Sequence, residues 1–265
     1  MKFEKNSFNK RMKSMLKVDF KRMLTTPLFY IMIGISFVMP ILILVMTTMM
    51  DGSVTTDPQT GVQTTIEGFK NVWQIIGTVS GGEAQMSMDI ISMCNINMMF
   101  FVVAVFVCIF ISDDFRSGYS KNLFTVRSKK TDYAISKSAV CFVAGVGMIV
   151  AFFIGSMLGG AIAGLPFTLE GVTAFQVAMS LISKILLVGI FVSIFMFASI
   201  IAKQRLWLAL ILSLGIGMLF FTMVPIITPL NSGLMNVILC LAGSVAFIAL
   251  FVWLSNIILK KFDIL

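Results

Sequence analysis

The chain has 265 residues, of which 58% are hydrophobic and 12% are charged, and its mean hydropathy is +1.00. A soluble domain carries about 25% charged residues, so this chain has too few charges to cover a water-facing surface. The composition excludes a soluble enzyme, a disordered tail and a small disulfide-stabilised secreted domain. It predicts an all-α, polytopic membrane protein.

The sequence offers few signs of a catalytic or metal site. It contains no His, which is the commonest metal ligand. Its cysteines stand singly in apolar runs, so we expect neither a disulfide framework nor a zinc site. They are Cys94, Cys108, Cys141 and Cys240. No phosphate-binding P-loop motif occurs, and we therefore expect no catalytic residue, no metal ligand and no cofactor in this chain.

Charge-free stretches predict six membrane spans. A span needs about 20 apolar residues, and the last stretch, 206–259, is long enough for two, with Pro225 and Pro229 near its middle. The predicted order is an N-terminal amphipathic interfacial (elbow) helix within 1–27, a span at 28–50, an outer loop at 51–85, a span at 86–112, a cytoplasmic loop at 113–137, spans at 138–164, 179–202 and 206–223, an outer re-entrant segment or plain loop at 224–235, and a span at 236–259.

The distribution of basic residues supports this count. With six spans, 18 of the 20 Lys and Arg residues fall on one side, and the other side holds only Lys70 and Lys184. Because basic residues concentrate on the cytoplasmic side, we expect both termini in the cytoplasm. The net charge of +8 then reflects contact with the anionic lipid of a cell membrane, and no nucleic-acid partner is expected.

Residues 8–25 are predicted to form an amphipathic helix in the headgroup plane. Apolar residues recur there at three- and four-residue spacing, while lysines line another face. These lysines, the predicted interfacial anchors, are Lys10, Lys13, Lys17 and Lys21. Pro27 then ends the helix, because proline cannot continue it. A leader that only directs topology is the alternative.

Two further segments carry candidate residues. In the outer loop, Trp73 is a predicted interfacial anchor. In and before the second span, flexible methionines and two amides form a candidate cargo pathway, with ordinary packing of the methionines as the alternative. These residues are Met93, Asn95, Asn97 and Met98. Lys184, near the outer end of the fourth span, is expected to extend to the headgroups, with a functional ion site as the alternative.

Glycines four apart in the third span predict close helix packing. Gly155 and Gly159 form such a pair, and small residues at this spacing let helix backbones approach. We favour packing within the subunit over a dimer seam.

The connector 113–137 is longer than a tight turn requires. Phe115, Tyr119 and Leu123 recur in it at a spacing of four, with cations interspersed. We expect a short helix parallel to the membrane that presents aromatic and cationic side chains to a soluble partner. A second headgroup-lying helix without a partner is the alternative.

The arrangement resembles the membrane subunits of ATP-binding-cassette exporters of the type-2 permease family. That family has a cytoplasmic amphipathic helix, six spans, and a first cytoplasmic loop with an acidic–aromatic–Arg–Ser–Gly pattern, then Lys-Asn-Leu, an Arg, a Tyr and a Lys. The matching residues are Asp114, Phe115, Arg116, Ser117, Gly118, Lys121, Asn122, Leu123, Arg127, Tyr133 and Lys137. Residues 21–30 are also similar. Asp114 replaces the usual Glu, and Tyr119 replaces a common Thr.

The resemblance implies a coupling helix that docks in a groove on a separate ATPase subunit. Its ATPase-coupling residues would be Asp114, Phe115, Arg116, Ser117, Gly118, Tyr119, Leu123 and Arg127. It also implies a bacterial cell-membrane complex of two permease subunits, identical or related, with two ATPases that bind ATP and Mg²⁺. The expected cargo is an antimicrobial or toxin-like amphipathic peptide, or else a lipid or drug. An ion-coupled carrier and a non-transporting immunity or anchor protein are the alternatives from other classes.

Overall fold

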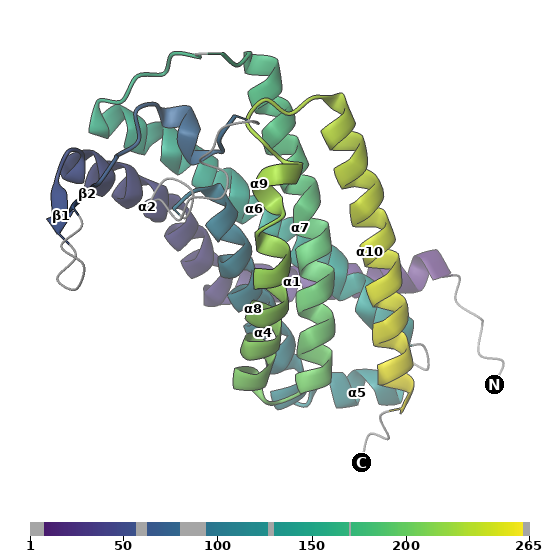
Figure 1. The fold of residues 1–265 in the computed structure, drawn as a ribbon. Helices are drawn as coiled ribbons and strands as arrows, with labels where there is room; N and C mark the ends of the chain where they lie inside the picture. The colour runs from purple at the N-terminus through teal and green to yellow at the C-terminus, as the bar shows by residue number, and fades with distance from the viewer. Residues whose placement is uncertain (1–7, 57–62, 80–93, 127–129, 170, 262–265) are drawn as a thin grey trace, which may run out of the picture.

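The computed structural model describes residues 8–56, 63–79, 94–126, 130–169 and 171–261. Their elements are almost all helical (Figure 1). In chain order they are α1 (Phe8–Thr25), α2 (Pro27–Met50), β1 (Val54–Thr56), β2 (Gln63–Thr65), the 3₁₀ turns η1 (Val72–Ile75) and η3 (Ile96–Met98), α4 (Met99–Arg116), α5 (Tyr119–Val126), α6 (Lys130–Ala163), α7 (Ala174–Ala202), α8 (Leu206–Phe221), α9 (Val224–Ile227) and α10 (Leu234–Lys261). The two strands pair antiparallel, with Val54 opposite Thr65.

Five helical segments of the described chain are long and apolar enough to cross a membrane. They are α2, η3 with α4, α6, α7 and α10. These helices make the chain an all-α, multi-pass membrane protein. The remaining predicted span, 206–223, the fifth in chain order, corresponds to α8, an apolar helix of 16 residues, which is shorter than the roughly 20 residues of a typical span.

Several helices extend beyond their predicted ends. α4 continues to Arg116 and α6 begins at Lys130, so the predicted connector 113–137 contains two helix ends and only the eight-residue α5 between them. Charged residues were expected to end the spans. They remain helical here because ion pairs and solvent satisfy them at the helix ends. The predicted start of the second span, 86–93, lies outside the described residues.

α7 lies at the centre of the bundle and contacts α4, α6, α8 and α10, while α2 packs along α6. The α2–α6 contact depends on glycine. A Cβ atom at Gly159 would lie 2.8 Å from the Cα of Ile41 in α2, and one at Gly155 would meet the carbonyl of Phe37. The prediction that these glycines pack helices within the subunit is therefore confirmed.

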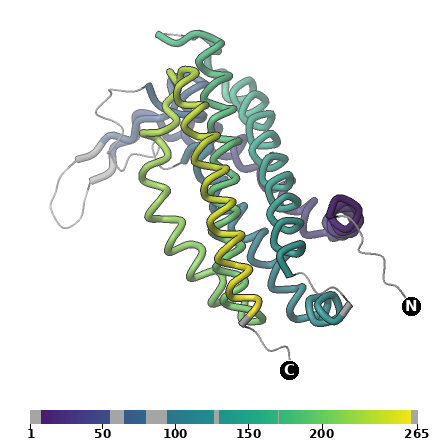
Figure 2. Tube along the Cα trace, turned by 90° about the vertical axis from the view of Figure 1, so that its right-hand side faces the viewer, coloured from purple at the N-terminus to yellow at the C-terminus, as the bar shows by residue number. Residues whose placement is uncertain are grey.

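α1 and α5 run across the bundle rather than along it. Both are seen nearly end-on in Figure 2, where α6, α7 and α10 run lengthwise. α5 closes one end of the bundle, here named the α5 end. The opposite end, here named the α9 end, carries η1, α9 and the α6–α7 connection. The two ends contain different polar interiors, and each is built from segments distant in sequence.

Candidate functional site

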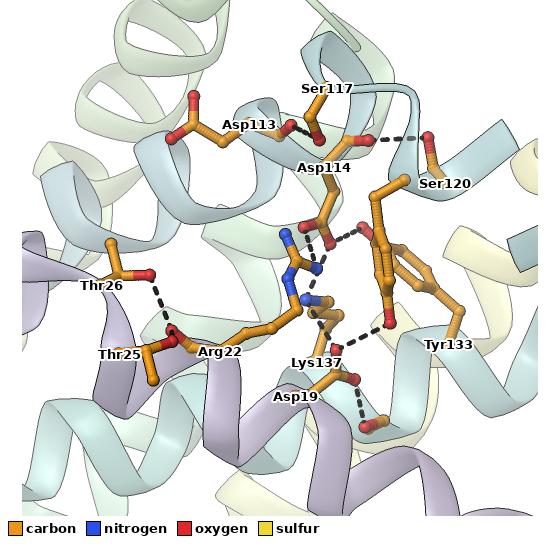
Figure 3. Close-up of polar contacts among 12 residues, drawn as sticks. Asp19, Arg22, Thr25, Thr26, Asp113, Asp114, Ser117, Ser120, Tyr133 and Lys137 are labelled. Atoms are coloured by element: carbon orange, nitrogen blue, oxygen red, sulfur yellow. Dashed lines mark hydrogen bonds and ion pairs between the residues drawn. The ribbon is translucent and has the colours of Figure 1, made fainter. Parts of the chain in front are cut away.

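A buried ionic cluster joins four helices at the α5 end (Figure 3). α1 contributes an acid and a base, the last turn of α4 contributes an acid, and α6 contributes a base. These four are Asp19, Arg22, Asp114 and Lys137, and the hydroxyl groups of Tyr119, Tyr133 and Ser136 surround them. We call this set the ionic cluster.

Asp114 lies at the centre of the ionic cluster, and its side chain is 0% exposed. One carboxylate oxygen lies 2.7 Å from Nη1 of Arg22. The other lies 2.8 Å from Nζ of Lys137 and accepts a 3.0 Å hydrogen bond from the Tyr133 hydroxyl. The last turn of α4 is thus joined to both α1 and α6.

Lys137 lies between the two carboxylates (Figure 3). Besides Asp114, its ammonium group lies 3.0 Å from Oδ1 of Asp19, and both side chains are 0% exposed. Asp19 also accepts a 2.5 Å hydrogen bond from the Ser136 hydroxyl. The Lys137 ammonium lies 4.2 Å from the ring centroid of Phe110. With two acids and two bases, the ionic cluster has no net charge. Charges buried away from water need such pairing.

Arg22 connects the ionic cluster to α5. Its guanidinium carbon lies 3.8 Å from the ring centroid of Tyr119, the first residue of α5. Burial lowers the pKa of Arg22, but the adjacent Asp114 carboxylate outweighs this effect, and the net pKa lies above the usual value. Burial, followed by the nearby charge of Asp19, raises the pKa of Tyr119. At neutral pH, Arg22 is therefore charged and Tyr119 neutral.

Helical spacing places the cluster residues on shared faces. Asp19 and Arg22 are three apart on α1, and Tyr133, Ser136 and Lys137 lie at i, i+3 and i+4 on α6, so each set shares one side of its helix. α1 ends at Thr25, and near this end the Thr25 and Thr26 hydroxyls donate to the Arg22 carbonyl, at 3.1 and 2.7 Å.

A second ion pair lies farther along the α1–α6 contact. Nε of Arg11 lies 3.0 Å from Oδ2 of Asp132, whose side chain is nearly buried. α1 is therefore joined to α6 at two points along its length. The two helices are held together by charge as well as by apolar packing.

The structure brings only part of the predicted coupling set together. Phe115 packs edge-on against Tyr133 at 6.4 Å between ring centroids, and Leu123 packs against the same core. Asp114, Phe115, Tyr119 and Leu123 therefore face the bundle. Arg116 and Ser117 are exposed, and the predicted coupling residue Arg127 lies outside the described residues.

Gly118 forms the turn between α4 and α5. Its φ is +72°, which L side chains rarely adopt, and a Cβ atom there would meet nothing within 4 Å. Glycine is thus needed for the backbone conformation of a tight turn. The space around Gly118 would admit a larger residue, so crowding is not the reason for glycine at this position.

The exposed side of α5 is polar and cationic. Lys121, Asn122 and Thr125 are exposed on it. The α7–α8 turn lies beside it, since Nε2 of Gln204 donates to the Phe115 carbonyl at 3.4 Å. That turn adds the exposed residues Lys203 and Arg205. With Arg116, these residues form what we call the cationic face: Arg116, Lys121, Asn122, Thr125, Lys203 and Arg205.

The predicted interfacial anchors differ in their surroundings. All four anchor lysines of α1, Lys10, Lys13, Lys17 and Lys21, are exposed, whereas Met15 and Met23 on its other face are buried. Trp73 is partly buried, and its indole Nε1 donates to the Phe167 carbonyl at 3.0 Å. Trp73 therefore contacts the α6–α7 connection.

Three of the four predicted cargo residues are described by the structure, and they lie in the α9 end. Asn95 and Asn97 are buried, as expected for amides that face the bundle interior, and the side chain of Asn95 accepts a hydrogen bond from the Asn97 backbone at 3.0 Å. Met98 is partly buried, and Met93 lies outside the described residues. The Asn97 side chain in turn accepts a hydrogen bond from Lys184.

The prediction that Lys184 extends to the headgroups is wrong. Its side chain is only 1% exposed and its ammonium group bonds within the protein. The reason is the start of α7, which begins at Ala174 rather than at residue 179. Lys184 therefore lies about 15 Å along the helix from its first residue, deeper than the predicted boundary placed it.

The part that α1 plays in the ionic cluster was not predicted from the sequence. Asp19 was overlooked because the helix was expected to contact lipid alone. A usable signal existed: Met15, Asp19 and Met23 are four residues apart and form the buried stripe of α1. A carboxylate on the apolar stripe of a helix indicates a cation on the element packed against it.

No protein-family model, no curated protein and no solved structure matches this chain. Within the described residues, no group of three or more potential metal ligands comes together. The fold and the ionic cluster thus define the chain as a multi-pass helical membrane protein with a neutral charged core at one end.

Proposed function

We propose that this chain is the permease subunit of an ATP-driven exporter of the type-2 ATP-binding-cassette family. In this proposal two six-span permease subunits, identical or related, act with two ATPase subunits that supply ATP and Mg²⁺. The observation that supports it best is the ionic cluster. Asp114, the acidic residue of the family-like motif, connects α1, α4 and α6 beside the transverse helix α5.

In the proposed mechanism, α5 is the coupling helix. The partner ATPase would displace α5, and the chain's own contacts would carry this displacement to α4 and α6. Phe124 of α5 packs edge-on against Tyr133 of α6 at 5.4 Å, and Tyr119 stacks on Arg22 of α1. Breaking a buried ion pair costs about 3–5 kcal/mol, so the four helices are expected to move as one body.

This mechanism assigns the partner contact to the cationic face. The aromatic side chains of α5 already pack on the chain's own bundle, which leaves Lys121 and its polar neighbours for the partner. The complementary surface on the ATPase would therefore be acidic. A headgroup-lying helix would instead direct its apolar side toward lipid, whereas Leu123 and Phe124 contact the protein core.

The proposal places the α5 end in the cytoplasm and the α9 end outside. The positive-inside distribution supports this orientation. α1 would lie in the cytoplasmic headgroups as an elbow helix, with its exposed lysines near anionic lipid. α8 would be the fifth of the six spans, with α9 completing its outer end, in a bacterial cell membrane.

The proposed cargo is an amphipathic or apolar molecule, with an antimicrobial or toxin-like peptide placed before a lipid or drug. The apolar helices α2 and α10 support this choice, since few of their hydrophobic side chains are buried on the single chain. Cargo would leave between two such subunits.

A crosslinking experiment tests the partner. A photo-crosslinking amino acid is placed at Lys121 on the cationic face, or at Lys70, an exposed lysine on the other side of the membrane in the proposed topology. The proposal predicts a covalent adduct with a nucleotide-hydrolysing protein from position 121 and none from position 70. Adducts with lipid alone from position 121 would contradict the partner assignment.

An ion-coupled carrier is the second candidate, and one observation favours it. Lys184 is a buried ionisable residue in a candidate span, and such residues occur in the proton and ion pathways of carriers. A cargo-uptake assay in vesicles that contain the chain and an ion gradient, but no ATP, distinguishes the ion-coupled carrier from the ATP-driven exporter. Gradient-driven cargo uptake would favour the carrier.

A further inference from the structure

Lys184 is held by three neutral oxygen atoms in the α9 end. Its ammonium group donates to Oδ1 of Asn97 at 3.1 Å, to the Thr228 carbonyl at 3.0 Å and to the Thr228 hydroxyl at 2.8 Å. An ammonium group has three protons, and each has one acceptor here. The side chain of Lys184 is thus fully bonded without a carboxylate.

These bonds join three segments that are far apart in the chain. Lys184 belongs to α7, Asn97 to η3, and Thr228 to the turn that follows α9. The η1 region joins the same assembly, because the Leu230 backbone N–H donates to the Thr78 carbonyl at 2.8 Å. Thr228 and Ser232 are 0% exposed. Lys184 therefore bonds to the segments that close the α9 end.

A buried cation held only by neutral groups is not the most stable arrangement for a static joint. Among the described residues, no salt bridge includes Lys184. Removal of an ammonium group from water costs several kcal/mol, and a core in which both the ammonium group and its acceptors are replaced by apolar groups is often more stable. The ammonium group has a clear advantage in a state where water reaches it. Intramembrane ionisable residues accordingly mark moving or conducting sites.

We propose that Lys184 is a positioning residue that acts as a reversible latch on the α9 end. In the closed state its ammonium group holds η3 and the turn after α9 against α7. In the open state these bonds are exchanged for bonds to water, so the two states stay close in free energy. The role as an outer gate rests on the proposed exporter function, but the latch itself does not.

Thiol accessibility tests the latch. The full-length chain, with its four native cysteines replaced by alanine, carries Ser232→Cys as a buried reporter in the turn after α9. A membrane-impermeant thiol reagent is added to vesicles that expose the α9 end. Lys184→Met should raise the labelling rate about tenfold, which corresponds to about 1.4 kcal/mol of lost closing free energy. Lys70→Met removes an exposed lysine, and should leave the rate unchanged.

A variant with the opposite effect excludes a merely structural role. Asn97→Asp would place a carboxylate beside the ammonium group, and an ion pair there should hold the latch closed. Labelling should fall below that of the parent chain while the thermal midpoint stays level or rises. Where Lys184→Met fails to fold, Thr228→Val removes only the hydroxyl acceptor and should raise labelling by a smaller factor. Unchanged labelling in both Asn97→Asp and the latch-weakening variant would overturn the proposal.

Labelling measured with the ATPase and nucleotide tests the latch and the proposed exporter function separately. Nucleotide that drives opening should speed labelling of the parent reporter and have less effect in Asn97→Asp. If the variants respond as expected but nucleotide has no effect with any ATPase, the latch stands and the exporter function fails.

Discussion

The ionic cluster and the Lys184 site are both buried and polar, but they balance charge in opposite ways. The ionic cluster pairs two acids with two bases, whereas the ammonium group of Lys184 has three neutral acceptors. A neutral, fully paired cluster suits a joint that stays closed, because opening it exposes several charges at once. A single cation with neutral partners can exchange them for water. The comparison assigns a rigid joint to the α5 end and a releasable one to the α9 end.

The largest effect should come from breaking the rigid joint. Lys137→Met leaves the buried Asp19 carboxylate with hydroxyl partners alone and leaves Asp114 with Arg22 as its cation. We expect the free energy of unfolding to fall by about 3–5 kcal/mol, measured by denaturant titration in detergent. Lys121→Met removes an exposed lysine of α5 and should change it by less than about 0.5 kcal/mol. Equal losses in both variants would show that the cluster does not hold these helices.

The same substitution at the other end sharpens the contrast. Lys184→Met removes three hydrogen bonds, which destabilises the fold, but it also removes a buried charge, which stabilises it. We expect the free energy of unfolding to fall by about 1–3 kcal/mol, which is less than the fall for Lys137→Met in the same titration. A larger loss than that of Lys137→Met would reverse the comparison.

The second ion pair between α1 and α6 should matter less. The Arg11 side chain is 24% exposed, so water can enter the space that Arg11→Ala leaves and can solvate the Asp132 carboxylate. A loss of about 1 kcal/mol is expected, visible as a lower thermal midpoint. Lys17→Ala, an exposed position on the same helix, serves as the control. Equal thermal midpoints in the two variants would show that the Arg11–Asp132 ion pair does not stabilise the contact between α1 and α6.

The contact between Tyr119 and Arg22 should give the smallest effect. Tyr119→Phe keeps the ring over the guanidinium group and loses only a 3.5 Å hydrogen bond to Asp19, so a change below about 0.5 kcal/mol is expected. Tyr119→Ala also loses the cation–π contact, and about 0.5–2 kcal/mol should be lost. Stability measurements on both variants separate the ring from the hydroxyl, and equal losses would contradict the stacking role.

The broad architecture could be predicted because apolar length and charge position are local properties of the sequence. α2 at Pro27–Met50 nearly matches the predicted span 28–50. Helix ends at charged residues were less predictable. Asp114 and Lys137 were expected to lie beyond the spans, yet both remain helical because they pair across α4 and α6, which only the tertiary structure brings together.

The depth of Lys184 could have been predicted from a local signal. Thr173 and Gln176 form a capping box, and their spacing of three is readable in the sequence as a helix start. It places the beginning of α7 at Ala174 and Lys184 well inside the helix. The partners Asn97 and Thr228 could not be predicted, since they come from segments about 87 and 44 residues away along the chain and meet only through packing.

The most direct test of the central claim compares two neighbouring carboxylates. Asp114 is buried in the ionic cluster, whereas Asp113 is exposed one residue earlier. The chain is reconstituted with its ATPase partner, and cargo moved per ATP hydrolysed is measured for Asp114→Asn and Asp113→Asn. The account predicts that Asp114→Asn lowers this ratio at least about tenfold, equivalent to about 1.4 kcal/mol, while ATP hydrolysis continues and Asp113→Asn matches the parent. An unchanged ratio in folded, membrane-inserted Asp114→Asn would contradict it.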